Sequence, residues 1–226
     1  MINHQYKCIY IHIPKTGGSS IEKKLGLFDT LAYGVQDHRN IREIRPRKSV
    51  ENIPLLFSKN AHFSRKKFLK APLSAFRNPE KELTKEQFDS YFKFTFVRNP
   101  WDRLYSWYKH VMRTEQHKRD MKLPDDCSFK KFMIEYRNVN YGFFSQLYWL
   151  QDYDGSLPFD FIGRFESLEN DFKQVAETIG LERPDLPNLL ISGNRPYTEA
   201  YNKELIDFVS EHFQEEITLF GYSFGE

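Results

Sequence analysis

Residues 6–20 read Tyr-Lys-Cys-Ile-Tyr-Ile-His-Ile-Pro-Lys-Thr-Gly-Gly-Ser-Ser, and this stretch decides the fold. The β-branched and aromatic residues up to Ile13 predict a strand, and residues 19–25 predict a helix. The loop between them carries a lysine, two glycines and several hydroxyl groups. Glycines let the backbone approach a ligand, helix-start N–H groups are partly positive, and lysine and hydroxyls donate hydrogen bonds. The stretch therefore predicts an anion-binding loop between a strand and a helix.

Two better-known phosphate loops do not fit these residues. A Walker A loop places its lysine after the glycines, whereas Lys15 precedes Gly17 and Gly18. A dinucleotide fingerprint needs Gly-x-Gly-x-x-Gly, which is absent here. Taken alone, the loop leaves one alternative, an ordinary strand–helix turn that happens to contain a lysine.

The overall composition is that of a globular protein with one domain, residues 1–226. The net charge is only +2, so the charge does not call for a nucleic-acid partner. The two cysteines form no metal or redox pair; we expect Cys8 to be a buried thiol and the compartment to be reducing. We see no signal peptide and no apolar run of membrane-spanning length, and therefore expect a soluble, cytoplasmic protein.

A second informative block covers residues 91–108. Residues 93–97 alternate as a strand does, Asn99 is suited to cap the helix that follows, and Pro100 suits its first position. Ser106 follows Asn99 by about two helical turns and returns to the same face. Arg98 and Ser106 can therefore meet over one ligand. The alternative is that Arg98 pairs with Asp102 and that Ser106 only packs.

A third strand-to-helix unit covers residues 159–179, with Arg164 or Phe165 at the end of its strand. Three such units predict an α/β fold with a central parallel sheet flanked by helices, in which Lys15, Arg98 and Arg164 share the carboxyl edge. Further helices are predicted at 38–44 (capped by Asp37), from the capping box at 84–87, and at 128–136, 141–150 and 198–220. A short apolar run at 55–57 is a candidate strand.

No metal site is predicted. His110 and His117 are not spaced with carboxylates or cysteines as metal ligands are, and we interpret both as surface histidines.

These motifs resemble those of a known family. Residues 13–20 resemble the 5′-phosphosulfate-binding loop of sulfotransferases, and residues 96–106 resemble their 3′-phosphate-binding strand and helix. Residues 161–172 and the Phe-Gly-Tyr at 220–222 are similar to the carbohydrate sulfotransferase group, sulfotransferase family 2. The resemblance implies a P-loop-like fold. It also implies that 3′-phosphoadenosine 5′-phosphosulfate (PAPS) is the sulfuryl donor and a carbohydrate hydroxyl the acceptor.

The resemblance also implies roles for single residues. Lys15 would contact the 5′-phosphosulfate and its bridging oxygen, within a loop formed by Pro14, Thr16, Gly17, Gly18, Ser19 and Ser20. Arg98 and Ser106 would hold the 3′-phosphate, and Phe165 would lie near the adenine. In-line transfer builds charge on the bridging oxygen, which a lysine and N–H groups stabilise without a metal.

The acceptor hydroxyl needs a general base, for which histidine is suited. His38 and His62 are the candidates, and we favour His38; His12 is interpreted as a supporting residue. Residues 37–70 are also rich in cations, which indicate either a solvated basic face or the seat of an acidic glycan: Arg39, Arg42, Arg45, Arg47, Arg65, Lys66, Lys67 and Lys70. Two alternative functions stay open, a kinase-like nucleotide phosphotransferase and a non-catalytic nucleotide- or glycan-binding module.

Overall fold

The computed structural model describes residues 1–30, 35–46, 83–137, 141–187 and 196–226. Its sheet has four strands in the order β1 (Ile2–Asn3), β2 (Cys8–Ile11), β3 (Phe92–Val97) and β4 (Phe161–Arg164). β2 pairs in parallel with β3, and β3 with β4, whereas the short β1 is antiparallel to β2. The three predicted strands and their parallel pairing are thus confirmed, and β1 is an addition that the sequence did not predict.

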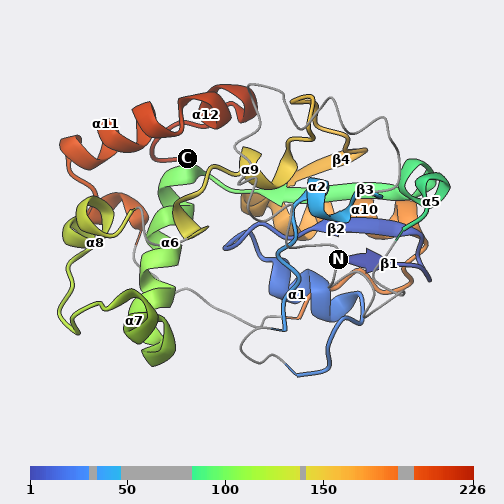
Figure 1. Cartoon of the computed structure of the whole chain (residues 1–226), viewed down its shortest axis with the longest axis horizontal. Coiled ribbons are helices and arrows are strands. Elements are labelled where there is room, and N and C mark those ends of the chain that lie inside the picture. Colours follow the sequence, from blue (N-terminus) through green and yellow to red (C-terminus); the bar gives the residue numbers. More distant parts are fainter. Residues whose placement is uncertain (31–34, 47–82, 138–140, 188–195) are drawn as a thin grey trace.

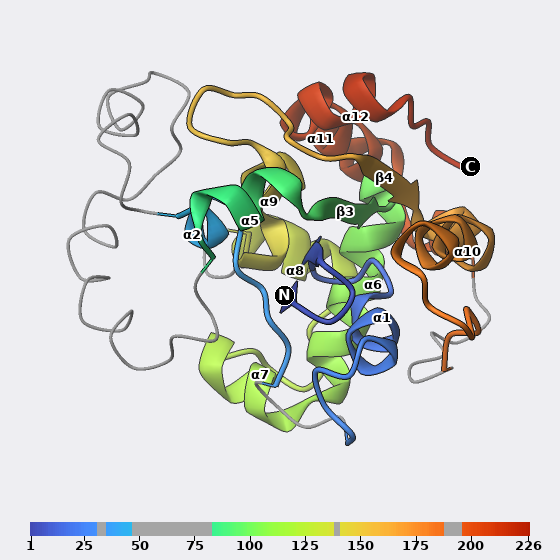
Figure 2. The ribbon, with the colours of Figure 1, turned by 90° about the vertical axis from the view of Figure 1, so that its right-hand side faces the viewer.

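The sheet is buried on both faces because its strands carry large apolar side chains that point to either side. Tyr10, Phe94 and Phe96 point to one face, where they pack with α1 (Gly18–Lys24) and α10 (Leu168–Ile179). Figure 2 shows both helices on the same side of the strands. Ile9, Ile11 and Val97 belong to a second, larger core on the opposite face. The alternation follows from the two-residue period of a strand.

The second core joins the sheet to a helical layer. α6 (Pro100–Arg113), α8 (Phe129–Glu135) and α11 (Lys203–His212) lie beyond the carboxyl ends of the strands, on the left of Figure 1. The other described elements are α2 (Ile41–Ile44), α5 (Lys85–Ser90), α7 (Glu115–Met121), η4 (Tyr141–Phe143), α9 (Leu147–Leu150), η5 (Phe165–Ser167), η6 (Tyr197–Ala200) and α12 (Gln214–Phe220). None of the helices in the described ranges is long and apolar enough to cross a membrane.

Local capping signals are confirmed where the side chain has no competing partner. Thr84 and Gln87 form the predicted capping box of α5. Asn99 accepts from the Trp101 N–H at 3.1 Å, and Pro100 occupies the first turn of α6. Ser128 caps α8 in the same way.

The predicted cap of α2 is wrong. Asn40, not Asp37, caps this helix and forms a capping box with Glu43. The Asp37 carboxylate is instead engaged by Arg39, whose guanidinium donates to it at 2.6–3.2 Å. Because Asp37 pairs with Arg39, the helix is capped about one turn later, by Asn40.

Two predicted helices are broken in the structure. Segment 141–150 divides into η4 and α9, because the Gly142 and Phe144 carbonyls accept from Arg103 instead of from helical N–H groups. Segment 198–220 divides into η6, α11 and α12, with the break at Phe213, which is buried. The candidate strand at 55–57 lies outside the described residues.

Phe94 provides a test of the sheet core. It is fully buried and its ring lies 5.0 Å from that of Tyr10, so Phe94→Ala should lower the free energy of unfolding by about 3–5 kcal/mol. Phe144→Ala, at a ring that is 43% exposed, should cost about 1 kcal/mol or less. Urea unfolding of both variants measures the difference, and equal losses would contradict the assignment of Phe94 to the core.

Candidate functional site

The carboxyl edge of the sheet brings the first two predicted anion sites together. Lys15 follows β2 and Arg98 follows β3. The Arg98 guanidinium donates from Nη1 to the Lys15 carbonyl at 2.9 Å. Arg98 is only 5% exposed, so this bond fixes the loop after β2 to the end of β3.

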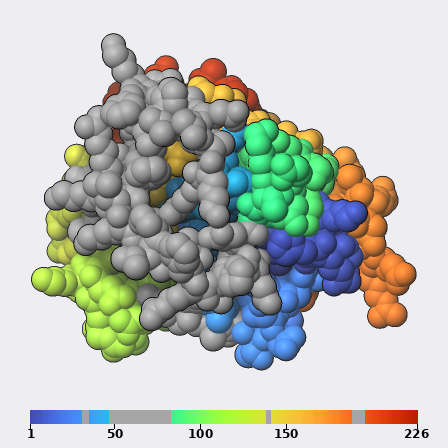
Figure 3. All heavy atoms as spheres, turned by 45° about the vertical axis from the view of Figure 1, so that its right-hand side comes forward, coloured from blue at the N-terminus to red at the C-terminus, as the bar shows by residue number. Residues whose placement is uncertain are grey.

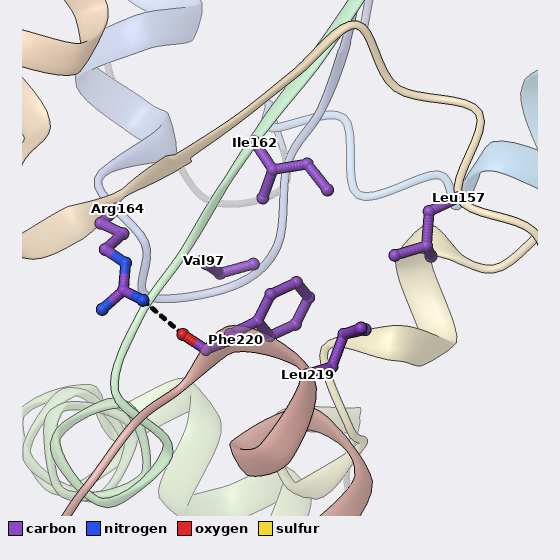
Figure 4. Close-up of a pocket in the computed structure, with 6 residues that line it drawn as sticks. All are labelled: Val97, Leu157, Ile162, Arg164, Leu219 and Phe220. Atoms are coloured by element: carbon purple, nitrogen blue, oxygen red, sulfur yellow. Dashed lines mark hydrogen bonds between the residues drawn. The ribbon is translucent and has the colours of Figure 1, made fainter.

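The carboxyl end of β4 contributes Phe165, and not Arg164, to the surroundings of Arg98. Arg98 Cζ lies 3.9 Å from the centre of the Phe165 ring, which also approaches the loop at Gly17. Arg164 turns the other way; its guanidinium donates to the Phe220 carbonyl and covers the Tyr222 ring at 4.7 Å. Figure 4 shows this bond beside a cavity of about 320 Å³, lined by Val97, Leu157, Ile162, Arg164, Leu219 and Phe220. Lys15, Arg98 and Phe165 do not line that cavity.

The predicted anion loop is tightly folded. Lys15 and Gly17 both have positive φ, of 72° and 81°, and the Thr16 hydroxyl donates to the Ile13 carbonyl at 2.9 Å. A side chain at Gly18 would overlap the His12 ring, so only glycine fits there. Ser19 Oγ accepts from Gln36 at 3.2 Å. Pro14 is buried and Ser20 is half-buried.

Positive charge accumulates around the half-buried Lys15 side chain. Burial, together with the charges of Arg98, Arg113 and Lys109, lowers the pKa of Lys15 to about 8. Like charges held this close repel, and a bound anion relieves that repulsion. The donor set of ammonium and guanidinium groups therefore fits a phosphate- or sulfate-bearing ligand.

For Arg98, the structure contains the ion pair that the sequence left open as the alternative, and a shared ligand with Ser106 stays a prediction. Arg98 pairs with Asp102 at 2.7 Å, and Ser106 is buried on the same helix. The same guanidinium nevertheless faces the Lys15 loop and the Phe165 ring. The ion pair orients the guanidinium at the edge where the ligand of an α/β sheet binds.

Gln146 and Glu216 support Arg98, and the sequence analysis missed both. Gln146 pairs with the Arg98 backbone, its Oε1 accepting from the N–H and its Nε2 donating to the carbonyl, each at 2.8 Å. Glu216 accepts from the Gln146 backbone N–H and from Ser145 Oγ, the latter at 2.6 Å. Both side chains are fully buried, and burial raises the pKa of Glu216. The sequence does give one signal for Glu216: it follows Val209 and Phe213 at the spacing of the apolar face of a helix, where a glutamate is unusual.

The candidate base His38 contacts His12, just before the loop, with the two ring centroids 4.2 Å apart. Its Nδ1 is 3.1 Å from the His12 carbonyl, which can only accept, so Nδ1 carries the proton and the lone pair sits on Nε2. Burial lowers the pKa of His38 to about 4, which leaves the ring neutral at pH 7. Its centroid lies 6.1 Å from the Tyr141 ring.

His12 has the supporting place that we expected. It is buried against Gly18, and its Nδ1 lies 3.1 Å from the Glu22 carboxylate, which is also buried. Burial lowers the pKa of His12 to about 3 and raises that of Glu22 to about 7. Burial therefore favours the neutral form of both groups.

His110 and His117 are not the surface histidines that we predicted. They are half-buried, their Nε2 atoms lie 3.2 Å apart, and both rings contact Trp107 at 5.6 Å. Burial lowers the pKa of His110 to about 4, and the charge of Lys15 contributes. His110 thus belongs to the surroundings of Lys15.

Part of the cation-rich segment 37–70 is buried. Arg42 is buried and donates to the carbonyls of Tyr148 and Gln151, and Arg45 pairs with Asp152 at 2.6 Å. The other candidate base, His62, and the cations Arg47, Arg65, Lys66, Lys67 and Lys70 lie outside the described residues. Within the described ranges, no three His, Cys, Asp or Glu side chains are grouped as metal ligands.

A mainly parallel sheet with cationic side chains after two of its strands defines an α/β protein whose carboxyl edge suits an anionic ligand. Residues 1–223 match the profile of the Sulfotransferase family, and the chain belongs to this family. Its fold is therefore the α/β fold of a sulfotransferase, and the chain is an enzyme of the sulfuryl-transfer class.

Two relatives illustrate the range of similarity. Carbohydrate sulfotransferase 10 of Xenopus laevis is 25% identical over 175 residues, which cover 61% of this chain and 49% of the relative. The chain thus matches about half the length of that protein. An uncharacterized protein of Archaeoglobus fulgidus is 32% identical over 100 residues, 43% of this chain and 74% of the relative. No solved structure matches the chain.

The Gln146 pairing predicts a stability loss centred on the site. Gln146→Ala leaves the Arg98 N–H and carbonyl unpaired in a buried place, so the free energy of unfolding should fall by about 3 kcal/mol. Amide hydrogen exchange at Arg98 should accelerate. Gln116→Ala, on the exposed side of α7, is the control and should change neither quantity. Unchanged protection of the Arg98 amide in Gln146→Ala would refute the pairing.

Proposed function

We propose that this enzyme transfers the sulfuryl group of PAPS to a hydroxyl group of a carbohydrate. The observation that carries the proposal is the bond from Arg98 to the Lys15 carbonyl, at 2.9 Å, in a chain of the Sulfotransferase family. It joins the two residues whose cations the nucleotide would need at its 3′- and 5′-ends. The carbohydrate acceptor rests on the similarity to Carbohydrate sulfotransferase 10.

The donor-side residues have distinct tasks in this proposal. Arg98, with Ser106 on the next helix, holds the 3′-phosphate, and Phe165 supports the base. Lys15 stabilises the charge that grows on the bridging oxygen of the leaving phosphate. Two fixed ends orient the donor for in-line attack, which lowers the entropic part of the barrier. PAPS supplies the activated sulfuryl group, and no metal is required.

His38 is the general base of the proposal. Its Nε2 lone pair accepts the proton of the acceptor hydroxyl as the oxygen bonds to sulfur and the bond from sulfur to the phosphate oxygen breaks. Adenosine 3′,5′-bisphosphate leaves. A pKa of about 4 keeps His38 unprotonated throughout the physiological range, and it also makes the ring a weaker base than a free imidazole.

Lys15 gives the first test. As the pH rises through about 8, the pKa of Lys15, the ammonium loses its charge, so the affinity for adenosine 3′,5′-bisphosphate should fall. The expected loss is up to about tenfold from pH 8 to pH 9, measured by isothermal titration calorimetry. Lys15→Arg should show a flat profile, since guanidinium does not titrate there.

Lys15→Ala should abolish transfer of labelled sulfate from PAPS while the protein stays folded. Retained turnover in this variant would exclude the proposed role of the loop. Magnesium-dependent turnover with ATP would favour the kinase-like alternative, and tight nucleotide binding without transfer to any acceptor would favour a binding module.

His38 gives the second test. His38→Ala should lower kcat by about 10²–10⁴-fold without weakening nucleotide binding, because the base acts on the acceptor and not on the donor. The wild-type rate should hold down to about pH 5 and fall as the pH approaches 4, where His38 becomes protonated. His62→Ala is the matched comparison. A large loss in His62→Ala alone would assign the base to His62, and two near-normal rates would reject both.

A further inference from the structure

Glu22 is a residue of α1 to which the proposed transfer gives no task, although its side chain is fully buried. Figure 3 shows the segment around α1 beside the N-terminal residues, in two shades of blue, and Glu22 contributes nothing to this surface. A buried carboxyl group is unfavourable unless polar neighbours compensate for the lost water. The neighbours of Glu22 therefore indicate what it does.

Both oxygens of the Glu22 carboxyl group lie beside groups that hold the candidate base. Oε1 accepts from the backbone N–H of Asp37 at 3.0 Å, and Oε2 lies 3.1 Å from Nδ1 of His12. Asp37 directly precedes His38, and the His12 carbonyl accepts from the His38 ring. Glu22 therefore contacts both the residue before His38 and the residue that fixes its ring.

The segment that carries His38 is attached to the Lys15 loop and its flanks at three successive residues. The three contacts run from Gln36 Nε2 to Ser19 Oγ at 3.2 Å, from the Asp37 N–H to Glu22 Oε1 at 3.0 Å, and from His38 Nδ1 to the His12 carbonyl at 3.1 Å. All three acceptors belong to the unit formed by β2, the loop and α1. The contact of Glu22 is the central one of the three.

We propose that Glu22 is a positioning residue for the transfer, and that it holds His38 in register with the Lys15 loop so that the Nε2 lone pair faces the acceptor hydroxyl. The role rests on the proposed function, because it takes His38 as the general base. A base must lie within hydrogen-bond reach of the proton that it removes, and small displacements of reacting groups are costly. A backbone donor bound to a fully buried acceptor suits this task, because the bond is not exchanged for one to water.

The test replaces Glu22 by three side chains. Glu22→Met removes the acceptor at similar volume, Glu22→Asp keeps the carboxyl group on a shorter side chain, and Glu22→Gln keeps an oxygen at the same reach. The Met and Asp variants should each lower kcat with labelled PAPS by about tenfold, the effect of one lost hydrogen bond, and Glu22→Gln should stay within about threefold of the wild type. The KM for PAPS and the Kd for adenosine 3′,5′-bisphosphate should change by less than about twofold in all three. Glu177→Met, at an exposed glutamate of α10, is the matched control and should change none of these quantities.

A double-mutant cycle with His38 separates positioning from a general effect on the fold. In the His38→Ala background, Glu22→Asp should cause no further loss of kcat, because a residue that acts through His38 has nothing left to position. Losses that multiply, an equal loss in Glu22→Gln, or a raised KM for PAPS would overturn the positioning role and leave the proposed transfer intact.

The imidazole of His38 gives a readout that does not depend on activity. Nitrogen-15 NMR should show Nδ1 protonated in the wild type and in Glu22→Gln, and a mixture of tautomers in Glu22→Asp and Glu22→Met, where the ring is no longer held against the His12 carbonyl. Unchanged His38 signals in the Asp and Met variants would overturn the positioning role. Absence of transfer by the wild type to every acceptor would instead overturn the proposed function, and the tautomer measurement would still decide whether Glu22 fixes the ring.

Discussion

The hydrogen bond from Arg98 to the Lys15 carbonyl is the contact on which the site depends. It spans 83 positions of sequence and joins the loop after β2 to the end of β3. A buried guanidinium beside a lysine is unfavourable unless its charge is compensated, and three groups provide that compensation: the carbonyl itself, the Asp102 carboxylate at 2.7 Å and the face of the Phe165 ring at 3.9 Å. Each comes from a different strand end or helix, so the guanidinium also sets how these elements meet.

The C-terminal helices are part of this arrangement although they contribute no residue to the anion site. Glu216 of α12 is buried and holds Gln146, and Gln146 in turn pairs with the Arg98 backbone. A buried carboxylate is costly, and the positive charge of the buried Arg103 offsets part of that cost. Breaking such a network is far more destabilising than replacing it entirely, because the partners left behind are unpaired and dry. The long path from α12 to the end of β3 is thus held together by hydrogen bonds at every step.

How much the sequence predicts depends on the range of the interaction. The strands, the loop at Lys15 and the Asn99 cap could be predicted because each follows from neighbours within a few positions. The role of Gln146 could not be predicted, because its side chain pairs with the backbone of Arg98, 48 positions away in the sequence. The cap of α2 failed for a related reason: Asp37 and Asn40 are both good caps, and the Arg39 ion pair decided between them. The burial of His110 was not predicted because segment 110–127 is polar in sequence, and the contact with His117 is visible only in the structure.

The backbone at Lys15 connects the loop's shape to its chemistry. A φ of 72° is uncommon for a residue with a side chain and costs about 1–2 kcal/mol, so the surroundings must enforce it. They do so from both sides, through Arg98 on the carbonyl and through the Thr16 hydroxyl on Ile13. A lysine placed after the glycines, as in a Walker loop, would not be held by the strand-end arginine in this way. Lys15 is therefore fixed by the same contact that positions Arg98, and the two cations are held where an anion bound between them would relieve their mutual repulsion.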